Sequence, residues 1–61
     1  MNVHTFRSLS IGDKVIAPGF GTQLITNQFL RIIDYIPVAF VALQDLGEIS
    51  EFESESIGLV N

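Results

Sequence analysis

The chain has 61 residues, no cysteine and a net charge of −4 at neutral pH. A chain of this length forms one domain with a small core, and without cysteine it has neither disulfides nor thiolate metal sites to stabilise it. Its three basic side chains argue against direct nucleic-acid binding, which requires several contacts to phosphate. The acids are concentrated at one end, since residues 32 to 61 hold six acids and no base.

Membrane insertion is not expected. No stretch approaches the roughly 18 to 20 consecutive apolar residues that span a bilayer, because Arg31, Asp34 and Pro37 interrupt the most hydrophobic region. The first ten residues also lack the apolar run of a secretory signal. We therefore expect a cytoplasmic protein, with an N-terminal arm at residues 1 to 10 and one folded domain at residues 11 to 61.

The segment IGDKVIAPGFG, residues 11 to 21, predicts a short strand between two turns. Gly12-Asp13 is typical of a turn, and the β-branched residues that follow predict a strand over residues 14 to 17. In the PGFG segment Pro18 has no amide N–H to pair with a neighbouring strand, so the strand ends there. Gly19 and Gly21 can adopt positive φ, so the chain turns. Between those glycines Phe20 is free to fold inward.

Residues 22 to 36, TQLITNQFLRIIDYI, fit two structures. Apolar residues recur along one helical face, which would give an α+β fold with a helix at about residues 25 to 36. The same segment is rich in β-branched residues and lies between two predicted strands, which favours a strand. We predict a strand that bends near Asn27-Gln28 and turns again near Asp34.

The rest of the chain predicts a hairpin and a closing strand. VAFVALQ, residues 38 to 44, predicts a strand that ends in a turn at residues 45 to 47. EISEF, residues 48 to 52, predicts its partner, and a tight helical turn at residues 53 to 56 leads to a last short strand, GLVN. The predicted fold class is all-β, a single five-stranded antiparallel barrel.

This order of elements resembles the SH3-like or Tudor-like small β-barrel. GDKVIAPGFGTQLI is similar to the opening of the small barrels of bacterial helicases and of CarD-type RNA-polymerase-interacting domains, although Gln23 stands where those families usually have glycine. VALQDLGEISEFESESIGLV resembles their closing hairpin and C-terminal turn. The resemblance covers residues 11 to 60 and implies a barrel that binds protein, or nucleic acid as Tudor-like and KOW-like barrels do.

The sequence predicts no catalytic residue, metal site or cofactor, and hence no enzyme. The only histidine, His4, stands in the terminal arm without an activated nucleophile, and the glycines of PGFG lack the lysine and helix of a phosphate loop. Four carboxylates in the second half lack the loop spacing of a calcium site. We therefore expect a solvated acidic edge made of Glu48, Glu51, Glu53 and Glu55.

Apolar residues outnumber the places in one small core, because neighbouring strand residues point to opposite faces. The expected core comprises Val15, Ile25, Val41, Leu43, Ile49, Phe52, Ile57 and Leu59. The expected protein-binding patch comprises Leu24, Phe29, Leu30, Tyr35 and Phe40, with Phe40 turned outward by alternation and placed in an interface beside Leu24 or Phe29. In the alternative, residues 27 to 36 fold over one end of the barrel and hide this patch.

Three functions are consistent with these features. The charge favours a non-catalytic protein-interaction module, an accessory or regulatory factor that forms homo-oligomers or docks on a larger machine such as a polymerase or replication enzyme. The second is a nucleic-acid-associated Tudor/KOW-like barrel. The third is a small acidic inhibitor that presents its carboxylates to a nucleic-acid-binding protein.

Overall fold

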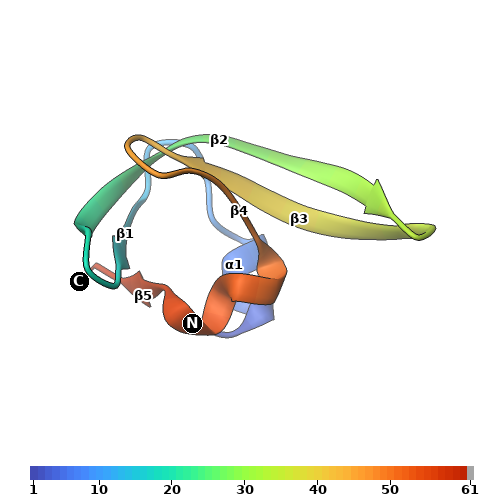
Figure 1. Ribbon diagram of the computed structural model, residues 1–61, viewed down its shortest axis with the longest axis horizontal. Coiled ribbons are helices and arrows are strands. Elements are labelled where there is room, and N and C mark those ends of the chain that lie inside the picture. Colours follow the sequence, from blue (N-terminus) through green and yellow to red (C-terminus); the bar gives the residue numbers. More distant parts are fainter. Residues whose placement is uncertain (61) are drawn as a thin grey trace.

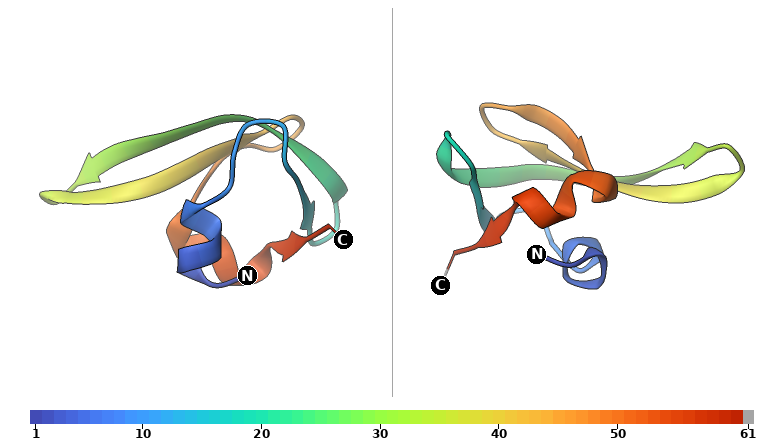
Figure 2. Two further views of the ribbon diagram at one scale, coloured as in Figure 1. Left: turned by 180° about the vertical axis from the view of Figure 1, so that it is seen from behind. Right: turned by 60° about the horizontal axis from the view of Figure 1, so that its bottom comes forward.

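The structure is a computed structural model that describes residues 1–60 and is mostly β. Its elements are α1 (Val3–Arg7), β1 (Lys14–Ala17), β2 (Gly21–Ile33), β3 (Ile36–Leu43), β4 (Gly47–Ser50), the 3₁₀ helix η1 (Glu51–Ser56) and β5 (Gly58–Leu59). The strands form one five-stranded antiparallel sheet in the order β4-β3-β2-β1-β5. The sheet arches over α1 and η1, which lie side by side (Figures 1 and 2).

The sheet is open, so the closed barrel expected from the sequence is not found. Its edges are β4 and β5, which do not pair with each other. β5 is only two residues long and pairs with β1, which leaves too little strand to complete a closure. Asn61, which the prediction included in the barrel, lies outside the described residues.

β1 has the bounds expected from the sequence, and the turn after it depends on glycine. Gly19 and Gly21 have φ values of 79° and 73°, a region that other residues rarely adopt. Phe20 lies between them at the tip of the turn and is 63% exposed. The expectation that this ring folds inward is wrong, because it lies beyond the last paired residues, Ala17 and Gly21.

β2 confirms the strand prediction for the ambiguous segment, and the helical alternative is wrong. The expected bend is a β-bulge, in which the pairing with β3 skips one residue, Thr26, between Ile25 and Asn27. The expected turn is formed by Asp34 and Tyr35, whose φ values of 50° and 66° give the geometry of a two-residue type I′ hairpin turn.

Beyond the bulge, β2 and β3 form a hairpin that projects from the rest of the molecule (Figure 1). β1 pairs with β2 only as far as Leu24, and β4 pairs with β3 only from Phe40 onward. Within residues 1–60, the outer part of the hairpin therefore has no neighbouring strand. The molecule measures 33 × 19 × 19 Å, and the hairpin extends along its long axis.

The core lies between the sheet, α1 and η1, and differs from the expected core at its ends. The buried cluster comprises Phe6, Leu9, Val15, Ala17, Ile25, Ala39, Val41, Leu43 and Ile57, with Ile49 packed partly against it. Phe52 and Leu59 are 73% and 49% exposed, so their assignment to the core is wrong. Phe52 belongs to η1 rather than to a strand, and Leu59 lies on the short edge strand β5.

The first residues contribute to the core rather than standing apart from it. The side chain of Asn2 caps α1 by accepting the Thr5 N–H at 2.8 Å, and Phe6 on this helix is 1% exposed. The Met1 ammonium group donates to the carbonyls of Ser54, at 2.9 Å, and Ile57. These bonds hold the beginning of the chain against η1 and its C-terminal end.

The burial of Phe6 yields the first prediction. Phe6→Ala should lower the free energy of unfolding by about 3 to 5 kcal/mol, because it removes a ring from a packed core. Phe52→Ala makes the same chemical change at an exposed site and should change it by no more than about 0.5 kcal/mol. Urea denaturation of both variants measures the difference, and equal losses would show that α1 does not complete the core.

Candidate functional site: the projecting hairpin

One face of the hairpin carries a stacked cluster of three side chains. Phe29 and Phe40 are paired across the strands, with ring centroids 5.5 Å apart and an interplanar angle of 5°. The guanidinium carbon of Arg31 lies 5.0 Å from the Phe29 centroid and 4.8 Å from the Phe40 centroid, within the range of a cation–π interaction. An ion pair of 3.1 Å joins Arg31 Nη1 to Glu48 Oε2 on β4. These contacts leave both rings half-buried.

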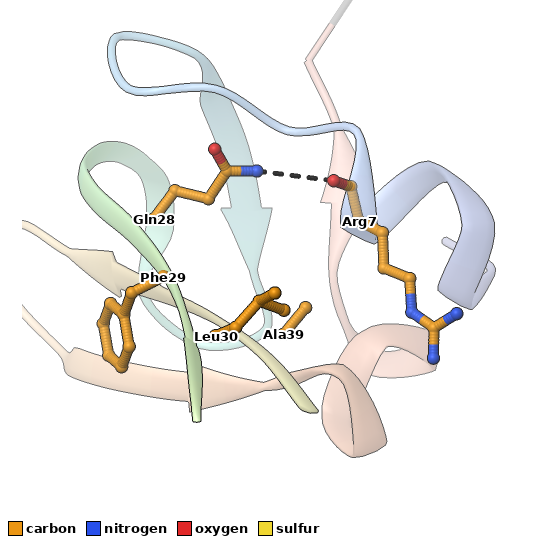
Figure 3. Close-up of a pocket in the computed structure, with 5 residues that line it drawn as sticks. All are labelled: Arg7, Gln28, Phe29, Leu30 and Ala39. Carbon is orange, nitrogen blue, oxygen red and sulfur yellow. Dashed lines mark hydrogen bonds between the residues drawn. The ribbon is translucent and has the colours of Figure 1, made fainter. Parts of the chain in front are cut away.

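The opposite face of the hairpin borders a groove beside α1. The groove has a volume of about 380 Å³ and is lined by Arg7, Gln28, Phe29, Leu30 and Ala39 (Figure 3). Gln28 Nε2 donates to the Arg7 carbonyl at 3.3 Å, which joins α1 to the beginning of this face. Leu30 lies two residues closer to the tip than Gln28 and is 70% exposed. The helix therefore covers only the inner end of the face.

Apolar side chains are also exposed at the tip. Tyr35 in the turn is 99% exposed. The exposed apolar residues of the hairpin are Leu30, Ile32, Ile33, Tyr35 and Ile36. Exposed apolar side chains gathered on one projection make the hairpin a candidate interaction site.

The structure divides the predicted patch rather than joining all of it. It brings Phe29 and Phe40 together on one face, with Val41 buried and Phe40 turned away from the core as expected. Leu30 faces the other side of the ribbon by alternation, and Tyr35 lies at the tip. Leu24 is half-buried beside Lys14 of β1, away from the hairpin tip.

The alternative in which residues 27 to 36 fold over one end of the sheet and hide the patch is wrong. Sequence reasoning also missed Arg31 and the isoleucines at positions 32, 33 and 36 as surface residues. Apolar residues on both sides of Asp34-Tyr35 were the available signal, because a two-residue turn places both flanks at the end of one hairpin.

The acidic edge is likewise divided among different roles. Glu48 is exposed and paired with Arg31, and Glu55 is exposed on η1. Glu53 Oε1 accepts from the Ser50 N–H and hydroxyl at 3.3 and 3.4 Å. The spacing S-x-x-E at residues 50–53 is a recognisable helix-start signal, and it would have placed the beginning of η1 correctly.

Glu51 is 4% exposed, so its expected place on a solvated edge is wrong. Its Oε2 accepts from Arg7 Nε at 2.9 Å and lies 2.6 Å from Arg7 Nη2, while its Oε1 accepts the Ala39 N–H at 3.0 Å. The hydrogen bond from Ala39 lowers the pKa of this carboxyl, and the bond and charge of Arg7 act in the same direction, against burial, which raises it. The carboxylate is therefore a structural element of the site.

The lowered pKa of Glu51 predicts how stability depends on pH. Its contribution is fully present above the ordinary value of 4.5 and is lost as the pH falls through the lower folded value, because protonation breaks the ion pair. Glu51→Gln should lower stability at neutral pH and flatten its fall below pH 4.5. Urea titrations from pH 7 to 3 measure this. Glu55→Gln is the control and should keep the wild-type pH dependence, whereas parallel curves for wild type and Glu51→Gln would contradict the assignment.

The described residues bring no metal-binding cluster together. Within residues 1–60, no group of three or more histidine, aspartate or glutamate side chains is arranged to hold a metal ion. His4 is exposed on α1. In the same part of the chain, no helix has the length and hydropathy needed to cross a membrane.

Comparisons with known proteins do not extend this picture. The chain matches no protein-family model, and searches of curated proteins and of solved structures gave no significant match.

Proposed function

We propose that the chain is a small non-catalytic protein-interaction module whose binding element is the projecting hairpin. The observation that carries the proposal is the exposed apolar surface on a two-stranded projection. Leu30 and Tyr35 leave most of their surface in water, although burial of such side chains stabilises a protein by about 1.5 to 3 kcal/mol each. A binding partner recovers this free energy on contact.

The pairing of basic side chains supports a protein partner over nucleic acid. Arg7 is bound to Glu51 and Arg31 to Glu48, so two of the three cations are already neutralised within the molecule. Lys14 is the remaining basic side chain, and no ion pair within residues 1–60 involves it. A phosphate backbone would meet little uncompensated positive charge on this surface.

The finer part of the proposal rests on the sequence resemblance. GDKVIAPGFGTQLI and the closing VALQDLGEISEFESESIGLV resemble the SH3-like or Tudor-like small barrels of bacterial helicases and of CarD-type RNA-polymerase-interacting domains. We therefore propose an accessory or regulatory factor that self-assembles or docks on such a machine. Exposed carboxylates such as Glu55 would orient the encounter.

A double substitution at the tip tests the function. Tyr35→Ser with Ile36→Ser should abolish the capture of another protein at the tip while leaving the fold intact, because both side chains are exposed. The control is Phe20→Ser, which removes an exposed ring from a different turn and should bind as wild type does. Sedimentation velocity measures self-association, and quantitative mass spectrometry of affinity captures measures partner binding. A wild type that neither associates nor captures any protein would refute the proposal.

The charge argument predicts weak DNA binding with a shallow salt dependence. With one unpaired basic side chain, the slope of log K against log salt should be no steeper than about −1, because each phosphate contact contributes about −0.9. Fluorescence anisotropy with a labelled duplex at several salt concentrations measures the slope. A steep slope with clear affinity at low salt would instead favour the nucleic-acid-associated alternative.

A further inference from the structure

The hairpin has two outer backbone edges, and only the edge of β3 is closed. Between the tip and the first residue paired with β4, the outward-facing positions of β3 are Pro37 and Ala39. Pro37 has no N–H to offer, and the Ala39 N–H is bound to Glu51 Oε1 at 3.0 Å. Proline and a capped donor are devices that keep an edge strand from pairing with another chain.

The edge of β2 has no such protection beyond Gln28. The Ala39 N–H points toward Glu51 and not toward β2, so Ala39 and Leu30 form a non-hydrogen-bonded pair of the ladder. The N–H and C=O of Leu30 therefore point away from β3. By alternation, Gln28 and Ile32 do the same. The Gln28 N–H is taken by Asn27 Oδ1 at 2.9 Å. The N–H and C=O groups of Leu30 and Ile32 and the Gln28 carbonyl therefore face outward, and no strand within residues 1–60 pairs with them.

We propose that a second copy of this chain pairs along the β2 edge, antiparallel and related by a two-fold axis at Leu30. This inference rests on the proposed function, because it names the partner that the hairpin binds. Each Leu30 then exchanges both backbone hydrogen bonds with Leu30 of the second copy, and each Ile32 N–H donates to the Gln28 carbonyl opposite. The two sheets join into one continuous sheet through their longest strands.

The length of the free edge fits this arrangement. β2 is covered up to Ile25, whose N–H and C=O bind Asp13 and Gly12, and the hairpin turns after Ile33. Beyond the bulge, the uncovered residues are 27 to 33, and Leu30 is their midpoint. With the axis at Leu30, Asn27 of one copy faces Ile33 of the other. The tip of each hairpin therefore ends where the edge of its partner becomes covered.

Side-chain charge and the number of hydrogen bonds favour this register over the two adjacent registers. An axis at Arg31 would place two guanidinium groups directly opposite each other, which destabilises a strand pair. An axis at Phe29 would leave Ile32 outside the paired segment and form fewer hydrogen bonds. The axis at Leu30 places Arg31 opposite Phe29 of the second copy, which extends the cation–π contact that Arg31 already makes within its own chain.

Cysteine crosslinking tests the register directly, because the chain has no cysteine of its own. Opposite residues of a hydrogen-bonded antiparallel pair have Cα atoms about 5.5 Å apart, which suits a disulfide. Leu30→Cys should therefore give a covalent dimer on mild oxidation. Tyr35→Cys is the control at a more exposed site, and in this dimer the two copies of residue 35 would lie roughly 30 Å apart. Efficient crosslinking of Tyr35→Cys with none at Leu30→Cys would overturn the proposal.

Charge substitutions at the axis provide a second test in solution. Leu30→Lys and Leu30→Glu should each weaken dimerisation by about tenfold or more, because like charges then face each other. An equimolar mixture of the two should restore a dimer, because Lys then faces Glu. Sedimentation velocity measures all three samples, with circular dichroism to confirm the strands.

The outcomes separate this inference from the proposed function. A wild type that is monomeric at every soluble concentration, but captures another protein through its hairpin tip, overturns the dimer and leaves the interaction module standing. A wild-type dimer that is unaffected by either charge at position 30 places the interface elsewhere and also overturns the β2 register. Dimer loss in each single variant with recovery in the mixture supports it.

Discussion

The buried carboxylate of Glu51 is the contact on which the arrangement of the other elements depends. One oxygen accepts the Ala39 N–H, so β4 ends at Ser50 without leaving that donor on β3 unpaired. The other oxygen binds Arg7 and holds α1 beneath the sheet, where Phe6 completes the core. A buried charge is stable only when such partners surround it, so strand end, helix position and core closure are coupled through one side chain.

Local patterns were sufficient to predict the strands but not the packing between distant segments. The β-branched residues of β1 and the turn chemistry of PGFG act over a few residues, and both predictions agree with the structure. Arg7 and Glu51 are 44 residues apart in the chain, and no local pattern relates them. α1 is only five residues long, too short to show helical periodicity. Phe52 was wrongly assigned to the core because the predicted strand was continued to residue 52, which belongs to η1.

The candidate site was predicted only in part, because it depends on one strand's alternation and also on the register between two strands. Alternation along β3 is a property of one strand, so it correctly separated buried Val41 from Phe40. The stacking of Phe40 on Phe29 depends on the register between two strands, which the bulge at Thr26 shifts by one residue. A single sequence does not specify that shift, and the predicted patch was therefore not resolved into two faces.

The bulge also determines which changes in chain length the hairpin can accept. Ile25 and Gln28 lie on the same side of β2 although they are three residues apart, because Thr26 is the extra residue between them. Deleting Thr26 would remove the bulge and keep both faces of the hairpin as they are, because Ile25 and Gln28 would then be two residues apart. Deleting one residue between Gln28 and the tip would instead move the residues beyond it to the opposite face. Removing or adding residues in pairs on each strand between the bulge and the tip would change only the length of the hairpin. Length variation in this region is therefore expected in steps of two residues per strand.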